Sequence, residues 1–148
     1  MTKRLLVSLI STLLIATLLV ACGSRPDTLR AYMDANPDEW EEAQEEAAAE
    51  AAEMSAMFGV EMASIFEIVG DHELVMNFKF TDADLFAGTD IAEILALELT
   101  AELESMMDFY TDLAIGMRRA MRIDTLYYTL RYLDADGNVL AELTVPGH

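Results

Sequence analysis

The stretch Leu74-Val75-Met76-Asn77-Phe78-Lys79-Phe80 decides the fold, because its apolar residues recur at every second position. Side chains alternate between the two faces of a strand, so every second residue of this stretch shares one face. The remaining positions, Val75, Asn77 and Lys79, then share the opposite face. We therefore expect a strand with one buried face and one face that is at least partly wet. The predicted buried set is Leu74, Met76, Phe78 and Phe80.

The residues before this strand predict its hairpin partner. Gly70-Asp71-His72 is a turn-prone stretch, and the segment 60–69 before it is rich in apolar and β-branched residues. The pattern of this first arm is less regular than that of the second arm. We expect Met62, Phe66 and Ile68 to point inward, with a bulge near Ser64.

A second hairpin is predicted near the end of the sequence. Residues 124–133 and 137–145 flank Asp134-Ala135-Asp136-Gly137, where Asp and Gly suit the conformations of a tight turn. Each arm again places apolar residues at every second position. The predicted faces are Leu126, Tyr128, Leu130 and Tyr132 on the first arm and Val139, Ala141, Leu143 and Val145 on the second.

Helices are predicted before each hairpin. Thr28 can cap a short turn of helix to Asp34, and Asn36-Pro37 is a strong start for a longer helix that ends near Gly59. Its apolar stripe is Trp40, Ala43, Ala47, Ala51, Met54 and Phe58. From Asp90, with Glu93 in a possible capping box, helical spacing continues without a break. That stripe is Ile91, Leu95, Leu99, Leu103, Met106, Tyr110, Leu113 and Met117.

These elements together predict an α+β domain. The order is helix, hairpin, helix, hairpin, and we expect a four-stranded antiparallel sheet with two helices packed on one face. Strand order does not follow from the sequence.

The N-terminus predicts export and lipid attachment. Lys3 and Arg4 precede an apolar run from Leu5 to Val20, the layout of a secretory signal. Leu19-Val20-Ala21-Cys22 matches a bacterial lipobox, which implies cleavage before Cys22 and acylation of its thiol. An uncleaved transmembrane helix is the other interpretation, but the run is short for a bilayer. We expect a signal peptide over 1–21, a lipidated tether over 22–27, and one acidic domain over 28–148 outside the bacterial cell membrane.

Charge limits the partners of this domain. The chain has 27 acidic and 9 basic residues, a formal net charge of −18, and cleavage would remove two basic residues and no acid. Arg30 is followed by no basic residue until Lys79. The negative electrostatic field of such a chain argues against nucleic acid as a partner and favours a cationic protein or peptide. A solvated helix face that only keeps the domain soluble is the alternative interpretation.

Few residues suggest catalysis or metal binding. Asp71 and His72, with nearby carboxylates, could serve a metal-dependent or hydrolase-like enzyme, although an exposed turn histidine is the simpler interpretation. Asp134 and Asp136 with Gly137 faintly resemble a calcium loop, but further oxygen ligands at the required spacing are missing, which favours a plain turn. No phosphate loop or nucleophile elbow occurs. We therefore expect a binding module with no catalytic residues, no metal ligands and no cofactor.

Several short motifs resemble a family of proteins. They are the lipobox, Thr28-Leu29-Arg30-Ala31-Tyr32, the entry from Gly70 to Val75, and the hairpin Arg131 to Gly137. In these the chain is similar to a family of small uncharacterised lipoproteins of Gram-positive bacteria, known only as a domain of unknown function. The resemblance implies an exported lipoprotein with an α+β fold, and it implies no activity or site residues.

Overall fold

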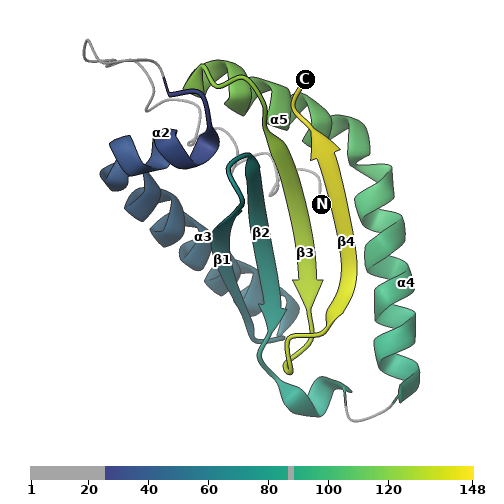
Figure 1. The fold of residues 1–148 in the computed structure, drawn as a ribbon. Helices are drawn as coiled ribbons and strands as arrows, with labels where there is room; N and C mark the ends of the chain where they lie inside the picture. The colour runs from purple at the N-terminus through teal and green to yellow at the C-terminus, as the bar shows by residue number, and fades with distance from the viewer. Residues whose placement is uncertain (1–25, 87–88) are drawn as a thin grey trace.

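The computed structural model describes residues 26–86 and 89–148, which fold around a four-stranded sheet in the spatial order β1-β2-β3-β4 (Figure 1). Four α-helices and one short 3-10 helix, η1, complete the described parts. The predicted α+β class is confirmed. The strands are β1 (Met62–Val69), β2 (Glu73–Phe80), β3 (Tyr127–Leu133) and β4 (Val139–Pro146). The helices are α2 (Leu29–Ala35), α3 (Pro37–Phe58), η1 (Ala83–Phe86), α4 (Thr89–Ser105) and α5 (Met107–Met121).

The sheet is mixed, so the predicted antiparallel sheet is wrong at its centre. Both hairpins are antiparallel, but β2 and β3 pair in parallel, with Glu73 opposite Tyr127. The reason lies in the connection. Helices α4 and α5 carry the chain from the end of β2 back to the level at which β2 begins, so β3 runs in the same direction as β2 (Figure 1).

The predicted unbroken helix from Asp90 to Met117 is also wrong, because it divides at Met106 into α4 and α5. Two helices, rather than one, therefore precede the second hairpin. A continuous helix of this length would measure roughly 42 Å, about one and a half times the roughly 26 Å of an eight-residue strand. The break lets α5 turn over the sheet while α4 packs along β4. Along α4, Leu103 is buried, whereas Ile91 and Leu97 are exposed.

The starts and ends of α2 and α3 largely follow the prediction. The Thr28 hydroxyl accepts a hydrogen bond from the Ala31 N–H at 3.1 Å and so caps α2. Pro37 is the first residue of α3, and Gly59 ends it in a left-handed conformation with φ of 68°. The side chain of Asn36 makes no capping bond, contrary to expectation, and its amide donates to the Tyr32 carbonyl instead.

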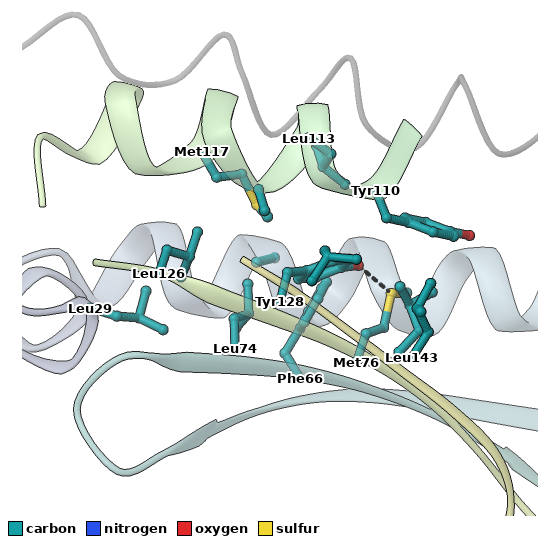
Figure 2. Packing of buried hydrophobic residues seen from close by; sticks show 14 of the residues in the cluster. Leu29, Phe66, Leu74, Met76, Tyr110, Leu113, Met117, Leu126, Tyr128 and Leu143 are labelled. Atoms are coloured by element: carbon teal, nitrogen blue, oxygen red, sulfur yellow. Dashed lines mark hydrogen bonds between the residues drawn. The ribbon is translucent and has the colours of Figure 1, made fainter. Parts of the chain in front are cut away.

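The core lies between the helices and one face of the sheet (Figure 2). The predicted buried residues Leu74, Met76, Phe78 and Phe80 are all buried. No bulge interrupts β1, whose register with β2 runs without a shift and places Ser64 among the inward residues. An irregularity occurs instead between Tyr132 and Leu133. The helices contribute to the same cluster Leu29, Tyr32, Met33, Ala43, Ala47, Leu103, Tyr110, Leu113, Ala114, Met117 and Met121.

The opposite face of β2 is less solvated than predicted. Val75 and Asn77 are buried, and only Lys79 of the predicted wet set is partly exposed. Polar side chains on this face bond to one another across the strands next to Val75. The Thr129 hydroxyl on β3 donates to Glu73 at 2.6 Å and lies 2.8 Å from the Thr144 hydroxyl.

Side chains from α2 and α3 cover the free edge of β1. Gln44 exchanges two hydrogen bonds with the backbone of Phe66, and the Ser55 hydroxyl accepts one from the Met62 N–H. Arg30 donates to the carbonyls of Ile68 and Gly70 at 3.1 and 2.9 Å. An edge strand with exposed backbone groups invites pairing with other chains. These contacts occupy that edge and fix α3 beside β1.

Candidate functional site

The turn that carries Asp71 and His72 lies between β1 and β2. The Asp71 carboxylate is 3.7 Å from Arg30 Nε, and both side chains are largely exposed. The His72 carbonyl accepts a hydrogen bond from the Tyr127 N–H at 2.8 Å, which ties the turn to the start of β3. The His72 ring is only partly exposed, and its Nδ1 atom is buried without a hydrogen-bond partner. The structure therefore places His72 deeper than an exposed turn residue and pairs Asp71 with Arg30.

Metal-ligating side chains do not gather in the part of the chain that the structure describes. Within residues 26–86 and 89–148, no group of three or more His, Cys, Asp or Glu side chains could hold a metal ion. The Asp134 carboxylate accepts hydrogen bonds from the backbone and the side chain of Asn138, at 2.7 and 2.8 Å. These bonds lower the pKa of Asp134. Both oxygens of Asp134 thus serve the hairpin turn, in agreement with the simpler interpretation of this loop.

The residues of the predicted membrane anchor lie outside the described residues. These are the signal over 1–21, the lipobox residues Leu19, Val20 and Ala21, and the acceptor Cys22. Within the described ranges, no helix combines the length and the apolar character needed to cross a bilayer.

An acidic surface runs along α3, on the side that faces away from the sheet. Its exposed carboxylates belong to Asp38, Glu41, Glu42, Glu45 and Glu53, and we call these five residues the acidic face of α3. The buried residues Ala43, Ala47 and Ala51 lie on the other side of the helix. Within the described ranges, none of the five carboxylates forms an ion pair. These five side chains give one side of α3 a negative charge along its length.

A cluster of tyrosines lies on the core face of the sheet, and the sequence analysis did not single it out. Tyr110 comes from α5, whereas Tyr128 and Tyr132 come from β3. Tyr110 and Tyr128 are only 2% and 4% exposed, and their ring centroids are 6.2 Å apart. The Tyr128 hydroxyl donates to the Met76 sulfur at 3.4 Å (Figure 2). Tyr132 is partly exposed and stacks on Phe78 with ring centroids 5.3 Å apart. We call Tyr110, Tyr128 and Tyr132 the tyrosine cluster.

Carboxylates on two helices act on this cluster. Burial raises the pKa of all three tyrosines, and the charges of Glu50 on α3 and Glu102 on α4 raise those of Tyr110 and Tyr132 further. Glu50 has the same effect on Tyr128. Burial, and then the charge of Glu53, raises the pKa of Glu50 itself to about 7. A sequence signal for this site exists in retrospect, because Glu50 interrupts the apolar side of α3 between Ala47 and Met54.

Comparison with known proteins adds no assignment. The chain matches no known protein family, no curated protein and no solved structure. The resemblance to small Gram-positive lipoproteins therefore stays a prediction from the motifs.

Proposed function

We propose that this protein is a lipid-anchored module on the outer side of the bacterial cell membrane that binds a cationic protein or peptide. The observation that carries the binding half of the proposal is the acidic face of α3, whose five exposed carboxylates have no ion-pair partner within the described ranges. The anchoring half rests on the lipobox Leu19-Val20-Ala21-Cys22.

The charge of the chain supports this choice of partner. A surface with one sign of charge raises the local concentration of ligands of the opposite sign and speeds their association. The same charge repels an anionic lipid surface. Acylation at Cys22 would therefore hold the domain at the membrane. The acidic face of α3 would attract a cationic partner that is soluble or bound to the cell surface.

An enzymatic role for Asp71 and His72 receives less support. A catalytic base needs a partner that orients it, whereas the Asp71 carboxylate lies beside Arg30 and the buried His72 Nδ1 has no hydrogen-bond partner. We therefore favour binding over catalysis for this chain.

The binding proposal is tested with a synthetic tetralysine peptide and the full-length chain in a neutral detergent. We expect binding that weakens as salt rises, because screening shortens the reach of exposed charges to about 8 Å at physiological ionic strength. Replacing Glu41, Glu42 and Glu45 together with Gln should weaken binding at least about tenfold, given about 0.5 kcal/mol or more for each charge. The matched control replaces three exposed acids of α4, Glu93, Glu98 and Glu104. Equal losses in both triple variants would refute a role specific to α3.

The anchoring proposal is tested in cells by labelling with palmitate. The wild-type chain should incorporate label and sediment with membranes, whereas Cys22→Ser should lose the label. Ser24→Ala, which leaves Cys22 in place, is the control and should keep the label. Labelling that persists in Cys22→Ser would overturn the lipobox assignment.

A further inference from the structure

Two buried oxygen atoms on the core side of α3 and β1 have no hydrogen-bond partner among the residues that the structure describes. They are Oε2 of Glu50 and Oγ of Ser64. Buried polar atoms of native proteins are almost always hydrogen-bonded, because an unsatisfied group costs about 1–3 kcal/mol. Two of them on facing elements point to a bound group that donates hydrogen bonds.

The contacts of α3 with β1 place Glu50 and Ser64 at the same level along the two neighbouring elements. Gln44 binds Phe66 and Ser55 binds Met62, so the helix and the strand run in opposite directions side by side. Ser64 lies midway between the two strand residues, and Glu50 lies midway between the two helix residues. Glu50 is one residue before the buried Ala51, or roughly 100° around the helix. This rotation turns Glu50 away from the edge of β1 and toward the core face of the sheet.

The tyrosine cluster faces the same region. In the register of the sheet Ser64 is opposite Phe78, which is opposite Tyr132, so these residues form one row across three strands. Figure 2 shows the rings of Tyr110 and Tyr128 extending in the same direction from α5 and β3. Tyr110 is 98% buried as a residue, although its hydroxyl is not among the buried atoms that lack a hydrogen-bond partner. Among the described residues, the partner of the Tyr128 hydroxyl is the Met76 thioether, which is a weak acceptor.

The effects of two carboxylates on the pKa values of the tyrosine cluster agree with this placement of Glu50. Glu50 raises the pKa of all three tyrosines, and Glu102 raises those of Tyr110 and Tyr132. Glu102 is exposed and Tyr132 is partly exposed, so the cluster extends from the core to the surface. The side of α4 and Tyr132 is therefore the side from which a ligand would approach the buried oxygens.

The side chains around the two buried oxygens are suited to bind a primary ammonium group. Such a group has three donors and no acceptor. Glu50 Oε2 and Ser64 Oγ, the two buried oxygens without a partner in the described part of the chain, can both accept, and so can the hydroxyl of Tyr110. The faces of Tyr and Phe rings attract a cation, and more strongly where water is excluded. The alkyl stem that carries an ammonium is compatible with the apolar surroundings of Phe78 and Met76.

We propose that the tyrosine cluster, together with Glu50 and Ser64, binds a primary ammonium group, with the Glu50 carboxylate as its counter-ion. The ammonium belongs to a lysine side chain of a bound peptide or to a free alkylamine. This inference rests on the proposed function in one respect, namely that the partner is cationic, and it assigns the site that recognises one positive charge of that partner.

The first experiment measures the binding of butylamine and of tetralysine to the full-length chain in neutral detergent, with butanol as a neutral control ligand. Both amines should bind and butanol should not. Affinity for butylamine should rise roughly tenfold between pH 6 and pH 8, because the ionised fraction of a carboxyl that titrates near pH 7 rises by that factor. Binding of butylamine should also lower the pKa of Glu50, which is measurable from its side-chain carbon resonance. Binding that does not change over this pH range would exclude Glu50 as the counter-ion.

The second experiment uses matched variants. Glu50→Gln should weaken butylamine binding at least about tenfold and abolish its pH dependence, since a single desolvated charge contributes more than about 1.5 kcal/mol. Tyr110→Phe should weaken binding severalfold. Glu45→Gln is the control, because it removes an exposed acid on the opposite side of α3 and should leave butylamine binding unchanged. Gln at position 50 keeps the neutral form of the side chain, so this variant is expected to fold.

The outcomes separate this proposal from the proposed function. Binding of tetralysine that is unchanged in Glu50→Gln but weakened in the variants of the acidic face would overturn the ammonium site and leave the proposed function in place. Binding of butylamine without binding of tetralysine would support the site and overturn the peptide partner. Binding of neither probe would overturn both.

Discussion

Gln44 of α3 and Phe66 of β1 are joined by a pair of reciprocal hydrogen bonds. The Gln44 amide donates to the Phe66 carbonyl at 2.7 Å, and the Phe66 N–H donates to Gln44 Oε1 at 2.9 Å. A side-chain amide has the same donor and acceptor as a neighbouring strand, so it completes the edge of the sheet at this residue. The pair also fixes which face of α3 meets the sheet.

We expect Gln44→Ala to destabilise the domain by about 1–3 kcal/mol, since two hydrogen bonds at roughly 0.5–1.5 kcal/mol each are lost. Glu45→Ala, one residue further along the same helix, is exposed and should change stability by less than about 0.5 kcal/mol. Urea unfolding followed by the fluorescence of Trp40 measures both. Equal stability of the two variants would show that the pair with Phe66 contributes nothing.

The close contact of Gly147 with α5 predicts that a larger residue at this position lowers the stability of the domain. A Cβ atom at Gly147 would lie 2.7 Å from the Ala114 carbonyl oxygen, a distance that side chains do not tolerate. Gly147→Ala should therefore destabilise the domain by about 1–3 kcal/mol through overpacking. Gly116 is the matched control, because nothing lies within 4 Å of its Cβ position in α5. Gly116→Ala should stabilise the helix by about 0.5–1 kcal/mol. Thermal unfolding of the two variants should shift in opposite directions.

Glu50 predicts a dependence of stability on pH. Its pKa is about 7 in the folded chain, above the ordinary value of 4.5, so the folded state holds the proton to higher pH than the unfolded state. The stabilising contribution of the protonated carboxyl is complete below about pH 4.5 and is lost as pH rises through 7. Glu50→Gln mimics the protonated form, so the stability of this variant relative to wild type should increase between pH 5 and pH 8. Partial exposure of Glu50 keeps the effect modest. A constant difference across this range in urea unfolding would contradict the assignment.

Substitutions of Arg30 and Asp71 distinguish two contributions to stability, the hydrogen bonds of Arg30 to backbone carbonyls and its ion pair with Asp71. Arg30→Ala removes the donors to the carbonyls of Ile68 and Gly70 and should cost about 1–3 kcal/mol. Asp71→Asn removes only the charge of an exposed partner 3.7 Å away and should cost less than about 0.5 kcal/mol. Denaturant midpoints of the two single variants and the double variant give the comparison. A loss in Asp71→Asn as large as that in Arg30→Ala would assign the stabilisation to the ion pair.

The sequence predicts the local elements of this fold well, because their signals lie within a few residues of each other. The alternation from Leu74 to Phe80, the start at Pro37 and the end at Gly59 all appear in the structure. The parallel pairing of β2 with β3 depends on where α4 and α5 return the chain, which no local pattern encodes. The break at Met106 likewise has no glycine or proline to announce it.

The candidate site was harder to predict than the fold. The members of the proposed site come from four elements, α3, β1, α5 and β3, so no local pattern in the sequence groups Glu50 and Ser64 with Tyr110. Each of these residues has an ordinary role on its own element. The polar residues that attract notice in the sequence, Asp71 and His72, lie in a turn, with Asp71 beside Arg30.

The parallel pairing of Glu73 with Tyr127 also has a kinetic consequence. Each hairpin joins strands that are neighbours in the sequence, and such hairpins form in microseconds. The central pairing closes a loop that contains η1, α4 and α5, and the entropy of that closure is lost before the contacts of β2 with β3 form. We expect the two hairpins to form first and their association to limit the rate of folding. Substitutions at the interface of β2 and β3 should then slow folding, whereas substitutions in the hairpin turns should mainly speed unfolding.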